Sequence, residues 1–179
     1  MKKASLLLAF FFALFSCQTL QQGQEMSYSA VSNDVPLASG TYYIVNNGLA
    51  LEPNNAMPGQ NVFLKPFNKS GMQKWIVTKK VSGKTVNYTI RLAGETDGLW
   101  FQGYPVKDHT PIIGTAAGAN VSYKIVPVPD SKTAWLIKSN RYNGDAMQSF
   151  VFNSELSNEI RFNPAEPENS KFRWEFVKE

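Results

Sequence analysis

The chain contains one cysteine, Cys17, and one histidine, His109, in 179 residues. A single cysteine cannot form an internal disulfide or a thiolate metal cluster, and a single histidine cannot supply the two histidines of a HExxH metal site. Acidic and basic residues are nearly balanced, with 14 Asp and Glu against 18 Lys and Arg, and no run of basic residues is longer than a pair such as Lys79–Lys80. The sequence therefore gives no reason to expect a nucleic-acid partner.

Motifs of common enzyme classes are also missing. The segment SGKT at residues 82–85 lacks the first glycine of a phosphate-binding loop, because that position is Thr78, and a hairpin is expected after it. No GxSxG nucleophile elbow is present. Glycoside hydrolysis needs two converging carboxylates, whereas those of this chain are scattered over loops and repeat edges: Glu52, Glu95, Asp97, Asp108 and Asp145. We therefore expect no enzymatic activity, no cofactor and no metal site.

Long apolar runs are absent except at the N-terminus, where the run is too short to cross a membrane. It covers residues 6–15, about half of the ~20 residues that a bilayer core requires, and it follows Lys2–Lys3. A basic start, an apolar run and the small residue Ser16 are typical of a secretory signal peptide. The motif LFSC resembles a bacterial lipobox, which implies that Cys17 is acylated and becomes the first residue of the mature chain.

These features divide the chain into three parts. We expect a lipoprotein signal peptide over residues 1–16, a lipid-anchored flexible tether over residues 17–36, and one folded domain over residues 37–179. The tether is rich in Gln and Ser and has no clear hydrophobic period. The predicted protein is a monomer held by its lipid on a membrane of the bacterial cell envelope. Since no acidic run follows Cys17, resemblance to known sorting patterns favours the periplasmic side over the cell surface.

Strand patterns recur three times along the predicted domain. Aromatic and apolar residues alternate in TYYIVN, NYTIRL and TAWLIK, at intervals of about 46 residues. A second segment starts with Gly in each repeat and ends on a polar side chain: GLALE on Glu52, GLWFQ on Gln102 and GDAMQ on Gln148. Third strands are expected near VFLKP, PIIGT and EIRFNP. Each repeat closes with an aromatic residue followed two positions later by an apolar one: Trp75, Tyr123 and Trp174.

About twelve short strands in three similar units predict a closed all-β architecture, because one unit cannot bury its apolar face alone. The segment Ala50–Trp75, ALEPNNAMPGQNVFLKPFNKSGMQKW, resembles a repeat of the ricin B-type β-trefoil lectin family, including the Gln-x-Trp signature at Gln73 and Trp75. The other two repeats match only in spacing and aromatic position. The resemblance implies a β-trefoil of three pseudo-repeats, in which Trp75, Tyr123 and Trp174 are core residues and Gln73 hydrogen-bonds to loop backbone.

The same resemblance implies carbohydrate binding in a shallow pocket of one or more repeats. Family lectins use an acidic residue at the end of the second strand, an aromatic platform on the third strand and an amide before the signature. In the first repeat these positions carry Glu52, Lys65 and Met72, so the galactose-type pattern is altered at all three. We therefore expect either a glycan other than galactose or a trefoil reused for a protein partner.

The second and third repeats offer further candidates. Strand alternation places Trp100 and Gln102 on one face and Phe101 on the other, so Trp100 is an exposed sugar platform if Phe101 is core. The alternative is that Trp100 only covers the barrel. The third repeat offers a polar set that is either a ligand site or a solvated face: Gln148, Asn158, Arg161 and Asn163.

A second function stays open, in which the trefoil binds a protein. The layout of SGTYYIVNN, QKWIVTKK and NYTIRL is also similar to fungal trefoil inhibitors of proteases, which present long loops to an active-site cleft. Candidate loops are residues 54–60, 105–111 and 153–158, and the alternative for each is an ordinary connection. An ordered loop projecting beyond the barrel would favour this function, whereas an exposed aromatic side chain beside amides would favour carbohydrate binding.

Overall fold

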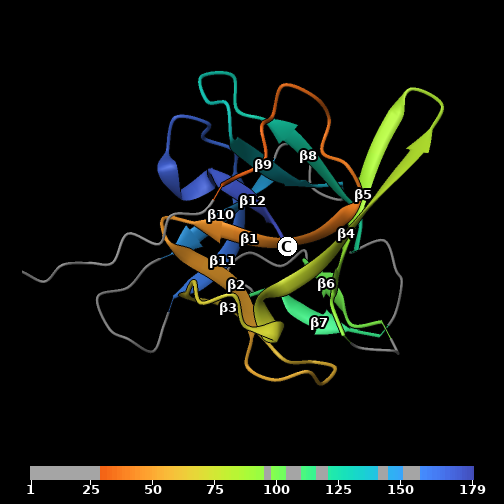
Figure 1. The fold of residues 1–179 in the computed structure, drawn as a ribbon, viewed down its shortest axis with the longest axis vertical. Helices are drawn as coiled ribbons and strands as arrows, with labels where there is room; N and C mark the ends of the chain where they lie inside the picture. The colour runs from red at the N-terminus through yellow and green to blue at the C-terminus, as the bar shows by residue number, and fades with distance from the viewer. Residues whose placement is uncertain (1–28, 95–97, 104–109, 116–120, 141–144, 151–157) are drawn as a thin grey trace, which may run out of the picture.

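The computed structural model describes residues 29–94, 98–103, 110–115, 121–140, 145–150 and 158–179 (Figure 1). Each repeat contributes four strands. The first repeat contains β1 (Gly40–Asn46), β2 (Leu49–Pro53), β3 (Val62–Pro66) and β4 (Lys74–Ser82), with the short 3₁₀ helix η1 (Gly71–Gln73) before β4. The second contains β5 (Thr85–Leu92), β6 (Trp100–Gln102), β7 (Ile112–Gly114) and β8 (Tyr123–Pro127). The third contains β9 (Ala134–Ser139), β10 (Asp145–Phe150), β11 (Glu159–Pro164), η3 (Ser170–Phe172) and β12 (Trp174–Lys178).

The first and fourth strands of the three repeats form a closed ring. They pair in the order β1, β4, β5, β8, β9, β12 and back to β1, all antiparallel. The second and third strands form the hairpins β2–β3, β6–β7 and β10–β11, each attached to the first strand of its own repeat. A six-stranded barrel with three such hairpins is a β-trefoil, which confirms the predicted all-β fold. No helix in the described ranges has the length and apolarity needed to span a membrane.

The turn sequences account for two of the tight hairpins. Between β1 and β2, Asn46 pairs with Leu49, and the two intervening residues, Asn47 and Gly48, have φ of 49° and 76°. Positive φ at both positions is what a type I′ turn requires, and Asn-Gly adopts it readily. Between β4 and β5, the turn is only two residues long and its first residue, Gly83, has φ of 58°. The resulting β4–β5 hairpin projects from the body of the molecule (Figure 1).

The closing aromatic residues of the three repeats are core residues, as predicted. Trp75, Tyr123 and Trp174 are all fully buried in the main hydrophobic cluster. Trp75 Nε1 donates to the carbonyl oxygen of Leu51 at 3.0 Å, and Trp174 Nε1 donates to that of Met147 at 2.8 Å. Each acceptor is a buried residue of the second strand. In both repeats the indole therefore ties the hairpin to the barrel while filling the core.

Tyr123 makes the equivalent bond in the second repeat. Its hydroxyl donates to the carbonyl oxygen of Phe101 at 3.0 Å and accepts from the backbone N–H of Gly103 at 2.8 Å. Burial raises the pKa of the Tyr123 phenol far above its ordinary value, so the donor stays protonated. The second repeat thus keeps the tie between hairpin and barrel without a tryptophan.

The segment before β1 lies against the barrel. Ala30 forms a bridge with Val177, and the Asn33 side chain donates to the carbonyl oxygens of Ser131 at 2.8 Å and Ala134 at 2.7 Å. Leu37 is buried in the main core cluster. Ala30 and Asn33 thus contact the barrel although they precede residue 37, where the sequence predicts that the folded domain begins.

Candidate functional site

Glu52 is the residue before the last in β2 and is held by partners from its own repeat. Its Oε1 accepts from Lys65 Nζ at 2.9 Å and its Oε2 accepts from Gln73 Nε2 at 2.9 Å. Lys65 lies on β3 at the position expected for an aromatic platform. The acidic side chain of the first repeat is therefore engaged in an ion pair and a hydrogen bond inside the protein.

Gln73 makes the backbone contacts that the resemblance implies. Its Oε1 accepts from the backbone N–H groups of Asn68 at 3.0 Å and Lys69 at 3.2 Å, and its Nε2 also donates to the carbonyl oxygen of Pro66 at 2.9 Å. The Gln73 side chain is fully buried. The Gln-x-Trp signature thus serves the scaffold: the glutamine fixes the loop before η1, and the tryptophan fills the core.

The polar residues of the third repeat also have partners within the protein. Gln148 Oε1 accepts from Asn163 Nδ2 at 2.8 Å, and Arg161 pairs with Glu159 at 2.6 Å between Nη2 and Oε2. Arg161 lies directly opposite Gln148 in the β10–β11 register. Asn158 precedes β11, and its backbone carbonyl oxygen accepts from Leu64 N–H at 3.0 Å. Its side-chain Oδ1 is buried and has no hydrogen-bond partner in the described part of the chain.

Four residues form a row across β4 of the first repeat and β5, β6 and β7 of the second. Ile76 of β4 faces Arg91 of β5, Arg91 faces Trp100 of β6, and Trp100 faces Gly114 of β7. Phe101 is fully buried, so the predicted alternation is confirmed and Trp100 lies on the outer face of β6. The Trp100 side chain is half-buried. Trp100 is therefore the one aromatic residue in this row, with Arg91 on one side and Gly114 on the other.

Two glycines, Gly98 and Gly114, allow side chains to pack closely around Trp100. Gly98 has φ of 65°, and a Cβ placed there would lie 3.3 Å from Trp100 Nε1 and 3.5 Å from Arg91 Cδ. The indole and the Arg91 side chain therefore run close to the Gly98 backbone. On the other side, a Cβ on Gly114 would lie 2.5 Å from Gln102 Nε2, so the Gln102 amide fills the space that a side chain would take. Gln102 is only 9% exposed.

This arrangement offers three kinds of contact to a ligand. An indole face can stack on the apolar face of a pyranose ring, and a guanidinium can donate to hydroxyl or carboxylate oxygens. The Gln102 amide lies beside them in a mostly buried position. The second repeat differs from the family pattern because its aromatic residue stands on the second strand, whereas the third strand carries Gly114 at the paired position.

The three repeats can be compared at this paired position. Lys65 faces Ala50, Gly114 faces Trp100 and Asn163 faces Ala146, so Lys65, Gly114 and Asn163 are equivalent. In the first and third repeats this residue contacts a polar side chain of the second strand, Glu52 or Gln148. In the second repeat it has no side chain. Arg91 and Gly114 stand in predicted strands, but their place beside Trp100 depends on the strand register and could not be predicted from the sequence.

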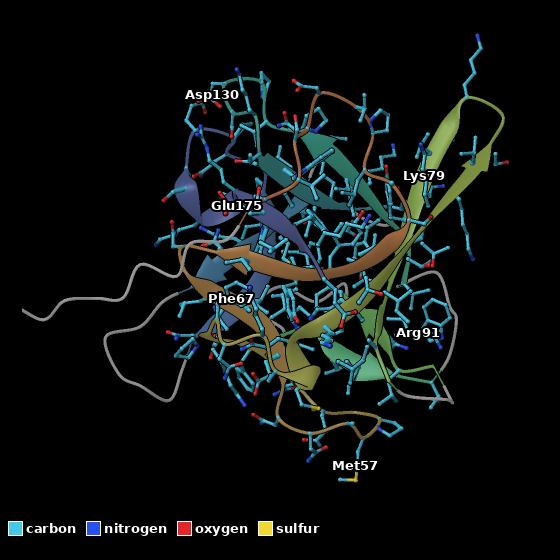
Figure 2. The ribbon with its side chains drawn as sticks, viewed as in Figure 1. Met57, Phe67, Lys79, Arg91, Asp130 and Glu175 are labelled. Atoms are coloured by element: carbon cyan, nitrogen blue, oxygen red, sulfur yellow. The ribbon has the colours of Figure 1, made fainter. Side chains whose placement is uncertain are left out.

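The predicted partner loops are described only in part. The loop at residues 54–60 is anchored by a hydrogen bond from Gly59 N–H to the carbonyl oxygen of Ile113 at 2.7 Å, and Met57 at its tip is 55% exposed (Figure 2). Residues 105–109 and 153–157 of the other two loops lie outside the described residues, as do Cys17 and His109. Among the described residues, no group of three or more His, Cys, Asp or Glu could hold a metal ion.

No protein-family model and no curated protein sequence matches the chain. The designed threefold-symmetric protein ThreeFoil is similar in structure, with a TM-score of 0.64 and 19% identity over 78% of this chain and 99% of its own. The Polyporus squamosus lectin, solved with the human-type influenza-binding epitope Neu5Aca2-6Galb1-4GlcNAc, gives a TM-score of 0.61 and 20% identity over 80% of this chain and 50% of its own.

A third similar structure is the Macrolepiota procera ricin B-like lectin, solved in complex with lactose. It gives a TM-score of 0.61 and 16% identity, over 81% of this chain and 100% of its own. At 16–20% identity, these similarities show a shared fold and do not identify binding residues in this chain. The chain is a β-trefoil, and the solved structures that resemble it include ricin B-like lectins.

Proposed function

We propose that this protein binds carbohydrate through the outer face of its second repeat. The observation that carries the proposal is the half-buried Trp100, which lies in one cross-strand row with Arg91 and Gly114 and beside the Gln102 amide. The indole stacks on a sugar ring, while the guanidinium fixes its oxygens. Gly114, which faces Trp100 on β7, leaves room for the Gln102 amide next to this row.

In this proposal, the polar side chains Glu52 and Gln148 of the first and third repeats stabilise the fold and do not bind the ligand. Glu52 is engaged by Lys65 and Gln73, so a ligand at that position would have to break an ion pair before it could bind. Gln148 is engaged by Asn163 in the same way. Breaking such contacts raises the free-energy cost of binding, because a partner is left unsatisfied. We therefore place the proposed site at the Trp100 row, where the aromatic side chain is the main contact surface.

Two of the similar structures support carbohydrate as the ligand class. The Polyporus squamosus lectin was solved with a sialylated epitope and the Macrolepiota procera lectin with lactose. In this chain, Trp100 and Gly114 of the row belong to the β6–β7 hairpin. The ligand itself is not transferable at 16–20% identity, so we propose the class and not the sugar.

The proposal includes a location. A signal peptide over residues 1–16 and the lone Cys17 support a lipid-anchored protein of the bacterial cell envelope, facing the periplasm. Cys17→Ser is expected to abolish incorporation of a labelled fatty acid into the protein and to release it from the membrane fraction. Retention of the label in that variant would contradict the anchor and leave the carbohydrate site unaffected.

A glycan array followed by calorimetric titration tests the site. The protein from Ser27 onward keeps every strand and core residue described above, and so serves for binding measurements. Trp100→Ala is expected to weaken binding of any array ligand at least about tenfold, which corresponds to the loss of ~1.4 kcal/mol of stacking and apolar contact. Its thermal unfolding should change little, because Trp100 lies outside the core cluster.

Phe63→Ala is the matched control. Phe63 is a partly buried aromatic residue on the hairpin of the first repeat, opposite Glu52. The proposal predicts unchanged affinity in this variant. A silent array, or equal losses in Trp100→Ala and Phe63→Ala, would overturn the assignment of a carbohydrate site to the second repeat.

A further inference from the structure

A groove opens where the β4–β5 hairpin leaves the barrel. Strands β5 and β8 pair only at Tyr88 and Tyr123, although β5 continues to pair with β4 as far as Thr85. The two strands therefore part beyond this point. The space between them has a volume of about 450 Å³ and is lined by residues 33–36, by residues 84–86 with Tyr88, and by residues 124–127. It lies away from Trp100, which is not among these residues.

The floor of this groove is apolar. Val86, Tyr88 and Ile125 line it from the two strands, and Val35 and Pro36 line it from the N-terminal segment. Val35 is 67% exposed. Val81, which faces Val86 across the hairpin, is 64% exposed. Exposed apolar side chains gathered at one place on a folded domain are typical of an interaction surface.

The rim of the groove is basic. Lys84 and Lys124 line it, and Lys79 stands on the same face of the hairpin, opposite Tyr88 (Figure 2). The hairpin sequence from Lys74 to Leu92 contains no Asp or Glu. The single carboxylate among the lining residues is Asp34, whose Oδ2 accepts from Ser32 Oγ at 2.6 Å. Charge complementarity therefore favours an acidic ligand over a basic one.

The groove also has two strand edges. Residues 85–87 of β5 pair with β4 on one side, and residues 124–127 of β8 pair with β9 on one side. Within the described residues, neither stretch has a strand partner on the side that faces the groove. Alternate backbone N–H and C=O groups of a strand point to each side, so such an edge can hydrogen-bond an added strand.

We propose that this groove binds an extended acidic segment of a partner polypeptide as an added β-strand. The backbone of the segment pairs with an edge of β5 or β8, its apolar side chains enter the floor at every second position, and its carboxylates meet Lys84 and Lys124. A strand pairs and alternates in this way, whereas a lipid headgroup or a sugar offers neither feature. The interaction is independent of the carbohydrate site.

The probe is a fluorescein-labelled peptide of about eight residues in which Glu and Val alternate, and the readout is fluorescence anisotropy. We expect saturable binding that weakens as salt is added, because exposed charges are screened. The double variant Lys84→Glu, Lys124→Glu should weaken binding at least about tenfold. Both lysines are exposed, so the fold is retained, which circular dichroism would verify. Lys178→Glu, an exposed lysine of β12 outside the groove, is the matched control and should bind normally.

Two further peptides test charge and strand addition separately. A Lys-Val peptide should not bind, and a Glu-Val peptide methylated at alternate backbone nitrogens should lose most of the affinity while keeping every charge. Equal binding of either peptide would overturn the proposal. So would binding to phosphatidylglycerol vesicles that depends on Lys84 and Lys124 when the Glu-Val peptide does not bind. Trp100→Ala should leave peptide binding unchanged, which separates this surface from the carbohydrate site.

Discussion

Tyr123 takes the place in the second repeat that tryptophan takes in the other two. A phenol is smaller than an indole, yet its hydroxyl reaches the same second-strand carbonyl that the indole N–H reaches in the equivalent positions. The hydroxyl also accepts a hydrogen bond, which an indole cannot do, and so satisfies Gly103 N–H. At the scale of single residues, the second repeat replaces tryptophan with tyrosine and keeps the hydrogen bond to the second-strand carbonyl.

Tyr123→Phe is therefore expected to destabilise the protein although it removes a single oxygen atom. The variant leaves Gly103 N–H and the Phe101 carbonyl oxygen without this buried partner, which costs about 1–3 kcal/mol. Urea unfolding would measure the change. Tyr43→Phe is the control, because the Tyr43 hydroxyl makes only a long contact of 3.4 Å to Lys69. An equal loss in both variants would contradict the role given to Tyr123.

Alkaline pH is expected to destabilise the protein through its buried tyrosines. Burial raises the pKa of Tyr42, Tyr88 and Tyr123 above the ordinary value of 10.0, with a smaller contribution from Tyr42 at Tyr88. The folded state then holds these protons more tightly than the unfolded state. Stability from this source is complete below about pH 10 and falls as the pH rises above it.

Urea unfolding across this pH range, together with the absorbance of tyrosinate, would measure the effect. Tyr123→Phe should show a smaller fall in unfolding free energy than the unsubstituted protein, because one of the raised groups is gone. A tyrosinate signal that appears near pH 10 for all tyrosines without unfolding would contradict the burial of these phenols.

At the scale of elements, the three hairpins share one pattern on the second strand but differ in the residue that faces it from the third strand. Each second strand places an apolar side chain into the core and a polar one at the outer edge: Leu51 and Glu52, Phe101 and Gln102, Met147 and Gln148. The third strand supplies a cation or an amide partner in two repeats, whereas in the second it carries Gly114, and the Gln102 amide occupies the space of the missing side chain. Gly114 thus allows the Gln102 amide to pack against β7 next to the Trp100 row.

Gly114→Ala tests this interpretation of the β6–β7 hairpin. The new methyl group would stand 2.5 Å from Gln102 Nε2, so the amide must move out of its place beside Trp100. We expect carbohydrate affinity to fall several-fold and stability to fall by about 1–3 kcal/mol. Gly71→Ala is the control, since no atom lies within 4 Å of the added carbon. Unchanged affinity in Gly114→Ala would show that the position of the amide is unimportant.

Gln73 joins the loop after β3 to the hairpin of the first repeat. Gln73→Met keeps the approximate volume but removes the acceptor for Asn68 and Lys69 N–H and the donor to Glu52. We expect a loss of about 2–3 kcal/mol in unfolding free energy with no effect on binding at Trp100. Calorimetric unfolding and the glycan titration would measure the two quantities. A loss of carbohydrate binding in a folded Gln73→Met protein would place a site in the first repeat instead.

At the scale of the whole molecule, the closed barrel depends on only part of each strand, and the outer part of the β4–β5 hairpin lies beyond it. The ring needs only the inner part of each strand, and the β4–β5 hairpin extends well past it (Figure 1). Beyond Tyr88 the hairpin contacts the barrel mainly through Val86, which packs against the core cluster. The projecting part is therefore available for an interaction without a large effect on the core.

Shortening the hairpin tests this separation. Replacing residues 81–86 with Asn-Gly would join the paired residues Lys80 and Asn87 by a type I′ turn. We expect a loss of no more than about 2 kcal/mol, since most of the deleted side chains are exposed. Carbohydrate binding should persist, whereas binding of the Glu-Val peptide should disappear. Failure of this variant to fold would show that the barrel depends on the hairpin.

The sequence by itself determined the repeat, the closed all-β architecture and the identity of the core aromatics, because these follow from local alternation and from residue size at equivalent positions. It also identified Glu52, Gln102 and Gln148 as polar side chains near the ends of the second strands. The partners of Glu52 and Gln148 could not be read from the sequence, since Lys65 and Asn163 meet them only through cross-strand register.

Tertiary structure alone decided which residues surround Trp100 and that a groove opens between β5 and β8. The Trp100 row exists because β4, β5, β6 and β7 align four residues that are far apart in the chain. The groove exists because β5 stays paired with β4 in the projecting hairpin, whereas β8 stays paired with β9. As a result, β5 and β8 pair at one residue pair only, Tyr88 and Tyr123. Alternation along a strand fixes which face a side chain takes, but only the pairing of strands fixes which neighbours it meets there.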